Sequence, residues 1–140
     1  MIAELTDAEI DELLHEQVVG RIGCHADGVT YVVPVIYAYD GESVHVATIE
    51  GQKVRMMRAN PSVCFEVDEY AAPGRWRSAI VQGTYEEAEG DEQAASLALL
   101  AERFASGGEG HGARRPEAHD RQTVCFRIRV REATGRAVSR

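Results

Sequence analysis

Two Asp-Gly pairs limit the possible folds of this chain more than any other feature, because each separates two segments made of strand-forming residues. Asp27-Gly28 lies between residues 18–26 and 30–40, and Asp40-Gly41 lies between residues 30–40 and 42–48. Asp-Gly is a preferred pair for two-residue hairpin turns, whose central residues need positive φ angles. The sequence therefore predicts three consecutive antiparallel strands that form a meander.

The rest of the chain combines strand patterns with helix patterns. A capping box, with Thr6 as N-cap and Glu9 three residues later, begins a short helix that reaches about His15. From the spacing of apolar residues we expect strands at 62–69, 75–89 and 122–133, and helices at 52–59 and 91–105. Six strands with helices between them and at the start predict an α+β fold, a small and mostly antiparallel barrel with short flanking helices.

Two residues mark special positions within these strands. Pro34 lies in the middle of the segment 30–40 and cannot donate a ladder hydrogen bond, so we expect this strand at a sheet edge or bulged there. Gly83 lies within the strand 75–89, where a glycine indicates a bulge or a close contact between elements.

The composition fits a single domain that covers residues 1–140. This length allows one hydrophobic core, and the hydrophobic content of 44% and charged content of 27% are those of an ordinary globular protein. The net charge of −8 disfavours nucleic acid, whose binding requires clustered cations, and disfavours an anionic membrane surface. We therefore expect neither nucleic acid nor a membrane as a partner.

The cysteine pattern and the N-terminal sequence favour the reducing cytoplasm as the location of this protein. The odd number of cysteines, without any C-x-x-C, argues against a disulfide framework and a zinc site, so we expect Cys24, Cys64 and Cys125 to be buried thiols. The acidic N-terminus does not resemble a signal peptide, and no apolar stretch is long enough to span a bilayer.

The stretch 48–61, TIEGQKVRMMRANP, carries the clearest binding signal. A strand ends at Thr48, the chain turns at Gly51, and a helix begins beside Lys53 and ends before Pro61. A helix start offers unpaired N–H groups and the positive end of a dipole, and the hydroxyl and ammonium add two donors suited to phosphate. In so acidic a chain, this cluster predicts a site for a phosphorylated ligand.

The segment 106–121 is rich in glycine and charge and has no periodicity, so we expect a flexible loop. It contains His111 and His119, but no carboxylate or thiol joins them at ligand spacing, so we predict no metal site.

The chain resembles the pyridoxamine 5′-phosphate oxidase-like superfamily of FMN-binding split barrels, and within it the small flavin-nucleotide-binding branch that includes the nitroimidazole-resistance (Nim-type) proteins. The resemblance lies in residues 20–69, 75–87 and 126–136. They contain, in order, G-R-x-G, Y-V-V-P-V-x-Y, D-G, G-x-K, N-P-x-V and W-R-S. It implies a split β-barrel fold.

The family further implies a homodimer with FMN in each of two clefts at the subunit interface. By this resemblance Lys53 would contact the FMN phosphate, and Thr48 and the backbone of Gly51 and Gln52 would complete the pocket. The residues expected along the isoalloxazine and ribityl groups are Val35, Ile36 and Tyr37. The segment expected near the interface consists of Trp76, Arg77 and Ser78.

Ala47, which precedes Thr48 and so belongs to the expected cofactor site, departs from the family pattern. Nim-type relatives usually carry a histidine at this position, on the substrate side of the flavin. His45 lies two residues earlier on the same strand face, one strand repeat away, and we expect it not to fill the same space.

These observations predict an FMN-binding protein that works as a flavin-dependent oxidoreductase on a small planar acceptor. Two alternatives stay open: a flavin carrier or sensor without catalysis, and a split barrel that uses the deazaflavin F420 or haem instead of FMN. No residue stands out as a catalytic group in the sequence.

Overall fold

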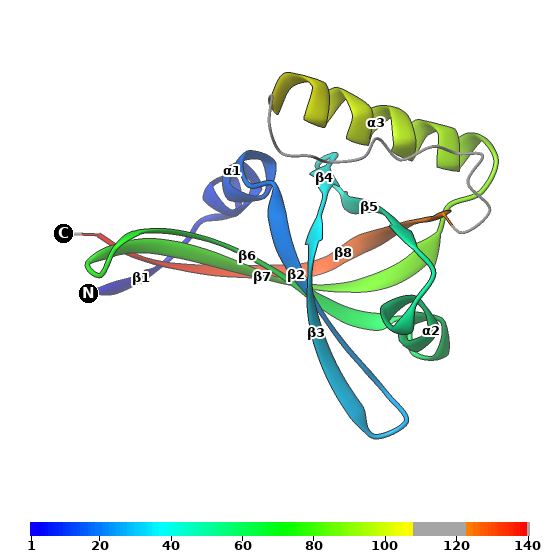
Figure 1. Cartoon of the computed structure of the whole chain (residues 1–140). Helices are drawn as coiled ribbons and strands as arrows, with labels where there is room; N and C mark the ends of the chain where they lie inside the picture. Colours follow the sequence, from blue (N-terminus) through cyan, green and yellow to red (C-terminus); the bar gives the residue numbers. More distant parts are fainter. Residues whose placement is uncertain (108–122, 140) are drawn as a thin grey trace.

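The computed structural model describes residues 1–107 and 123–139 (Figure 1). Three helices accompany one sheet in these ranges. The strands are β1 (Ile2–Glu4), β2 (Val19–Ala26), β3 (Val29–Ile36), β4 (Ala38–Tyr39), β5 (Ser43–Ile49), β6 (Ser62–Ala72), β7 (Arg75–Glu87) and β8 (Thr123–Val138). The helices are α1 (Asp7–Glu16), α2 (Gln52–Ala59) and α3 (Asp91–Gly107).

The fold is α+β, as expected, and every strand pairing is antiparallel. The strand order is β3-β2-β6-β7-β8-β5-β4, with β1 added to β8. The sheet is not closed, because its two terminal strands, β3 and β4, do not pair with each other in the described residues.

The expected number of six strands is wrong, since the sheet has eight. The segment 30–40 is divided into β3 and β4 at Tyr37, whose N–H donates to the carbonyl of Val18 at 3.1 Å in the register of the β2–β3 pairing. The last strand continues to Val138, five residues beyond the predicted end, and β1 pairs with this extension.

The first hairpin of the predicted meander is confirmed. In the second hairpin, strand pairing is limited to a few residues. At the first turn Asp27 and Gly28 have φ angles of 51° and 77°, and β2 pairs with β3 along its whole length. Beyond the second turn only two residue pairs join β4 to β5, and β5 instead pairs along its length with β8. The β2–β3 hairpin therefore forms an arm of its own (Figure 1).

The special strand positions are confirmed. Pro34 lies on β3, an edge strand, where a missing N–H costs no ladder bond. Gly83 lies at the register shift between β7 and β8, where a Cβ would approach the carbonyl oxygen of Arg129 to 2.7 Å.

The core lies between the sheet and the buried faces of α1 and α2. The predicted capping box is present: Thr6 Oγ1 accepts from the N–H of Glu9 at 3.2 Å, and the N–H of Thr6 donates to Glu9 Oε1 at 2.9 Å. The buried face of α1 meets Tyr37, whose hydroxyl donates to the carbonyl of Leu14 at 2.6 Å. The Tyr37 ring packs edge-on against Phe65, with ring centroids 4.9 Å apart.

Within the described ranges, no helix combines the length and the apolar character that crossing a bilayer requires.

Gly20 tests how tightly β2 packs over this core. A Cβ there would lie 2.2 Å from Cζ of Phe65, whose ring is fully buried, so Gly20→Ala should lower the free energy of unfolding by about 1–3 kcal/mol. Gly23→Ala on the same strand is the matched control, because its Cβ would meet only the flexible Cys64 Sγ at 3.0 Å. Chemical denaturation of both variants should show the larger loss at Gly20; equal losses would contradict this packing.

Candidate anion-binding site

The turn between β5 and α2 leaves a helix start without a capping side chain. Gly51 is the N-cap, its backbone is extended, and no side chain in the described residues accepts a hydrogen bond from the first turn of α2. A Cβ built on Gly51 would meet only the carbonyl oxygen of Ile49, at 3.9 Å. The first N–H groups of α2 and the positive end of its dipole therefore have no capping side chain among the described residues.

Lys53 adds a cation to this helix start. Its side chain is half-buried, and it makes no hydrogen bond or ion pair with any residue in the part of the chain that the structure describes. Burial lowers the pKa of the Lys53 ammonium, since removing it from water disfavours its charge. A bound anion would restore the interactions that the ammonium loses with water.

Thr48 is the last candidate donor near this helix start. We call Thr48, Gly51, Gln52 and Lys53 together the anion cradle. It is partly exposed on β5, and its hydroxyl has only one long contact, 3.4 Å to the carbonyl oxygen of Ile49. The hydroxyl can therefore turn to a ligand without breaking a strong bond. Thr48 lies at the end of β5, and Gly51, Gln52 and Lys53 lie at the start of α2, which follows it in the chain.

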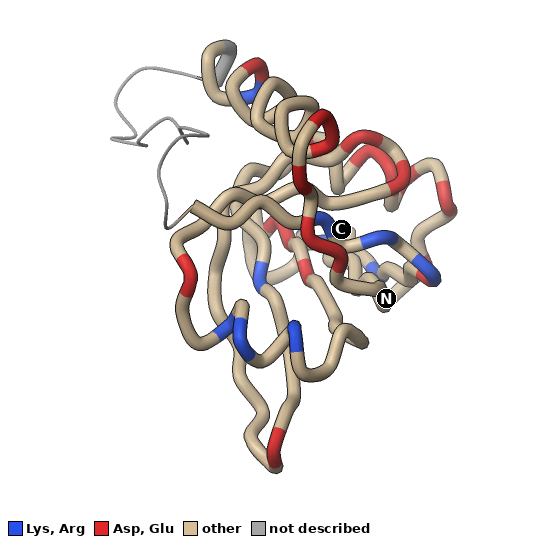
Figure 2. Tube along the Cα trace, turned by 90° about the vertical axis from the view of Figure 1, so that its right-hand side faces the viewer, with Lys and Arg blue, Asp and Glu red and all other residues tan. Residues whose placement is uncertain are grey.

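The charge distribution around α2 favours an anion. This helix carries Lys53, Arg55 and Arg58 and no carboxylate. Figure 2, seen from the side of α2, shows its cationic positions in the lower part of the molecule, while acidic positions gather in the upper part. Arg58 pairs with Glu50 and Glu87, so it belongs to a charged surface face.

The β7 residues of the predicted site lie far from α2 within one chain. Glu87, at one end of β7, contacts α2, whereas Ser78 lies about 30 Å away along the strand, at ~3.3 Å per residue. Trp76 and Arg77 lie still closer to the other end, where β8 separates β7 from β1 (Figure 1).

Arg77 is already engaged by carboxylates. It forms ion pairs with Glu12 and Glu16 of α1, and its Nε donates to Glu69 Oε1 at 3.0 Å. Arg77 therefore holds α1 against the sheet.

The residues at the end of β3 are divided between the core and the surface. Val35 and Tyr37 are buried among core residues, while Ile36 is exposed. Burial raises the pKa of the Tyr37 phenol, whose hydroxyl and N–H both have partners inside the protein. Tyr37 is therefore a core residue, and only Ile36 of the three presents its side chain to solvent.

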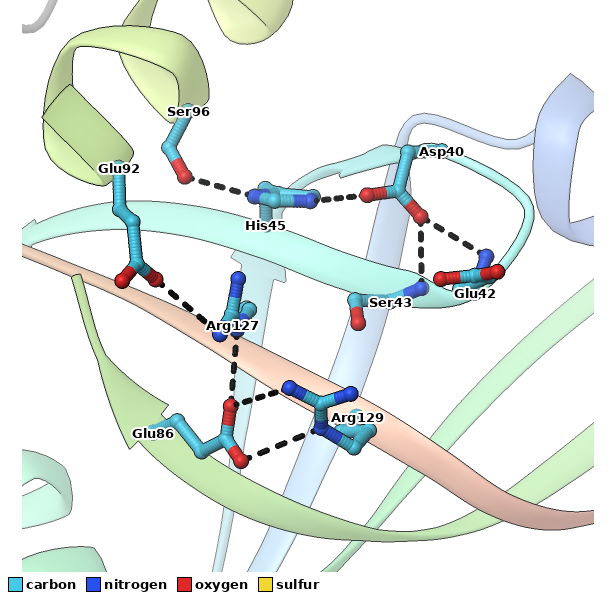
Figure 3. A network of polar contacts seen from close by, with 9 residues as sticks. All are labelled: Asp40, Glu42, Ser43, His45, Glu86, Glu92, Ser96, Arg127 and Arg129. Carbon is cyan, nitrogen blue, oxygen red and sulfur yellow. Dashed lines mark hydrogen bonds and ion pairs between the residues drawn. The ribbon is translucent and has the colours of Figure 1, made fainter.

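His45 does not occupy the space beside Ala47, as expected from the sequence. Ala47 is partly exposed and pairs across the sheet with Cys125, whereas His45 is buried beneath α3. Its Nε2 donates to Asp40 Oδ2 at 2.7 Å, and its Nδ1 lies 2.7 Å from Ser96 Oγ (Figure 3). The sequence gives no signal for this chain of contacts, since 51 positions separate His45 from Ser96.

The Asp40–His45–Ser96 arrangement is structural. A nucleophilic serine must reach its substrate, but Ser96 is only 2% exposed. The contacts instead join α3 to β5 and to the Asp40 turn. Next to them, Arg127 on β8 pairs with Glu86 at 2.9 Å and with Glu92 on α3 at 3.1 Å (Figure 3).

Asp40 is ionised in this setting. Burial opposes its charge, but hydrogen bonds from His45 and from the N–H groups of Glu42 and Ser43 outweigh burial, so the pKa of Asp40 is lowered. The two N–H groups donate to Asp40 Oδ1 at 2.8 and 2.7 Å.

The remaining predicted features concern metals, thiols and the loop. The described residues contain no group of three potential metal ligands, and their cysteines are free, with Cys24 and Cys125 buried and Cys64 partly exposed. Of the predicted loop 106–121, residues 106 and 107 belong to α3, and the rest, with His111 and His119, lies outside the described residues.

The sequence and the fold of this chain are similar to those of known proteins. The family model for pyridoxamine 5′-phosphate oxidase matches residues 6–137. A FAD-binding protein from Mesorhizobium loti is 30% identical over 99% of each chain, with a TM-score of 0.80. A proposed 5-nitroimidazole resistance protein from Bacteroides thetaiotaomicron shares the fold, with a TM-score of 0.76 at 19% identity over 98% of this chain and 89% of its own.

One curated relative of undetermined function matches part of the sequence. The protein RA0666 from Rhizobium meliloti (strain 1021) is 37% identical over 67 residues, which are 48% of this chain and 44% of that protein. The matched part is therefore less than half of that relative.

Asp40→Asn should lower the free energy of unfolding at pH 7 by about 1–3 kcal/mol, because a charged acceptor with three donors is lost. The folded pKa of Asp40 is lowered, so its stabilisation is complete above the unfolded pKa and is lost as the pH falls through the folded pKa. Denaturation at a series of pH values should show the two proteins converging below about pH 4.

Asp27→Asn is the matched control, since Asp27 forms the other Asp-Gly turn and accepts no hydrogen bond from a described residue. It should leave stability nearly unchanged at every pH. A constant deficit of Asp40→Asn down to pH about 2 would contradict an ionised Asp40.

Proposed function

The chain belongs to the pyridoxamine 5′-phosphate oxidase family, and on that premise we propose that it binds FMN and acts as a flavin-dependent oxidoreductase on a small planar acceptor. The phosphate would be held by Lys53, Thr48 and the backbone of Gly51 and Gln52.

Lys53 carries this proposal. A half-buried ammonium beside an uncapped helix start, without an acidic partner among the described residues, fits a ligand that brings its own negative charge. The Mesorhizobium loti relative is a FAD-binding protein, which supports a flavin. The single cation at the helix start supports FMN, whose phosphate is terminal and doubly charged.

A flavin supplies the redox chemistry when it is bound, and the protein supplies binding, orientation and electrostatics. In this chain Lys53 and α2 would anchor the phosphate, and Ile36 would flank the flavin from β3. Val35 and Tyr37 would shape that wall from the core side, since their side chains are buried.

A homodimer would complete the site. Within one chain, Lys53 and the segment 76–78 lie toward opposite ends of the sheet, so a single protomer cannot place both beside one flavin. A partner copy would bring its segment 76–78 to the cradle of the first.

One face of the sheet suits such a partner. Val32 is 65% exposed and Ile80 45% exposed, and strand register places them with Pro34 and Ile36 on the same side of β3 and β7. Between them, Arg21 reaches Asp68 at 2.9 Å, so the charge on this face is largely paired. Exposed apolar side chains around a paired charge cluster suit a protein interface, and we propose a second copy as the occupant of this face.

A flavin carrier or sensor is the second candidate function. Position 47, where Nim-type relatives carry a histidine, is an alanine, and the Tyr37 hydroxyl and the Arg77 guanidinium already have partners inside the protein. Oxidation of NADH or NADPH with quinone or nitroaromatic acceptors would separate the two candidates. Turnover well above that of free FMN supports an enzyme, and turnover equal to free FMN supports a carrier.

Lys53→Ala should weaken FMN binding by roughly ten- to a hundredfold, the loss of a charge-assisted hydrogen bond to phosphate. Calorimetric titration with FMN measures this directly. Arg55→Ala removes the same charge from an exposed position on the same helix and should change the affinity less than about threefold. Equal affinities of both variants would remove Lys53 from the phosphate site.

Ile80→Glu should convert the dimer to monomers and weaken FMN binding, because it places a charge inside the proposed interface. Val29→Glu is the control, since Val29 is similarly exposed but lies on the opposite face of the β2–β3 arm. Sedimentation analysis of both variants measures the oligomeric state. A dimer that persists in Ile80→Glu would exclude this face as the interface.

A further inference from the structure

We propose that Arg58 is a positioning residue of the anion cradle, which holds the turn before α2 in place through Glu50 and Glu87. The inference rests on the proposed FMN site, and it assigns a role in binding to a residue that does not itself belong to the cradle.

Arg58 lies in the last turn of α2 and bridges two carboxylates from different elements. Its Nη1 donates to Glu50 Oε1 at 2.7 Å, and its Nε donates to an oxygen of Glu87. Glu50 directly precedes the N-cap Gly51, and Glu87 is the last residue of β7. The guanidinium therefore links the start of the cradle to the end of a central strand.

The link continues into the core. Glu87 Oε1 also accepts from the hydroxyl of Tyr85 at 2.8 Å. Tyr85 is 7% exposed, and its ring packs against Phe126 with centroids 5.0 Å apart. A continuous series of contacts thus runs from Phe126 through Tyr85, Glu87 and Arg58 to Glu50.

The turn has few other restraints. Glu50 and Gly51 lie between β5 and α2 and belong to neither. Among the described residues, the bond from Arg58 is the only side-chain hydrogen bond that ties this two-residue turn to the rest of the protein. Because glycine has wide conformational freedom, a loosened turn would sample geometries that no longer present the helix start to phosphate.

The bridge stays charged at neutral pH. The hydrogen bond from Arg58 holds the pKa of Glu87 below its usual range, and the two carboxylates raise the pKa of Arg58. All three side chains are partly exposed, so the ion pairs add little to global stability. Their expected effect is on the geometry of the turn, and hence on phosphate affinity.

A simpler alternative is that Arg58 only adds positive charge near the phosphate. Glu87 separates the two accounts, because it is an anion that contacts α2. If charge alone matters, Glu87→Gln should tighten FMN binding. If the bridge matters, the same substitution should weaken it.

The experiment compares calorimetric affinities for FMN and riboflavin in four variants. Arg58→Gln and Glu87→Gln should each weaken FMN binding by roughly three- to tenfold, the effect of one hydrogen bond. Arg58→Lys keeps the charge but cannot bridge both carboxylates, and should also weaken FMN binding. Arg55→Gln, the matched control on the same helix, should leave the affinity nearly unchanged. Riboflavin, which lacks the phosphate, should bind all four alike.

Three results would overturn the proposal: equal FMN affinities of Arg58→Gln and Arg55→Gln, tighter FMN binding by Glu87→Gln, or a parallel loss of riboflavin affinity. The first two leave the FMN site intact if the unaltered protein binds FMN and Lys53→Ala does not. Failure of the unaltered protein to bind FMN would remove the proposed function and the role of Arg58 together.

Discussion

The buried side chain of Tyr37 is the contact on which the rest of this structure depends. Its ring packs on Phe65, its hydroxyl binds the carbonyl of Leu14, and its N–H binds the carbonyl of Val18. These contacts fix the point at which the chain leaves β3 and begins β4. Beyond this division β5 pairs with β4 along one edge and with β8 along the other, and the end of β5 leads into the turn and α2. A residue expected beside the flavin thus lies in the core, at the point where the chain leaves β3.

Local chemistry made most of the elements predictable. The capping box of Thr6, the turn at Asp27, the edge position of Pro34 and the bulge at Gly83 each follow from one or two residues, and all are confirmed. The segment 48–53 is predictable for the same reason, because turn, helix start and lysine are adjacent in the chain.

Long-range pairing limited the prediction elsewhere. The two extra strands depend on partners far away: β1 forms only because β8 reaches Val138, and β4 begins just after Tyr37, whose hydroxyl binds α1. The contacts of His45 with Ser96, and of Arg58 with Glu87, likewise join residues far apart in the sequence. Such contacts become visible only when the fold is known.

The cradle and the apolar face of the sheet together suggest how this family member would hold a flavin with few charged side chains. Most partly buried arginines here already have carboxylate partners, while Lys53 has none among the described residues. A positive site on an otherwise acidic protein would select an anion by its charge, and the rest of the flavin would rest against apolar surface.

The most direct test is the ratio of the affinities of the unaltered protein for FMN and riboflavin, measured side by side by calorimetry. If the cradle holds phosphate, FMN should bind at least about tenfold more tightly than riboflavin, since only FMN engages Lys53 and the start of α2. Equal affinities for the two flavins would contradict the account.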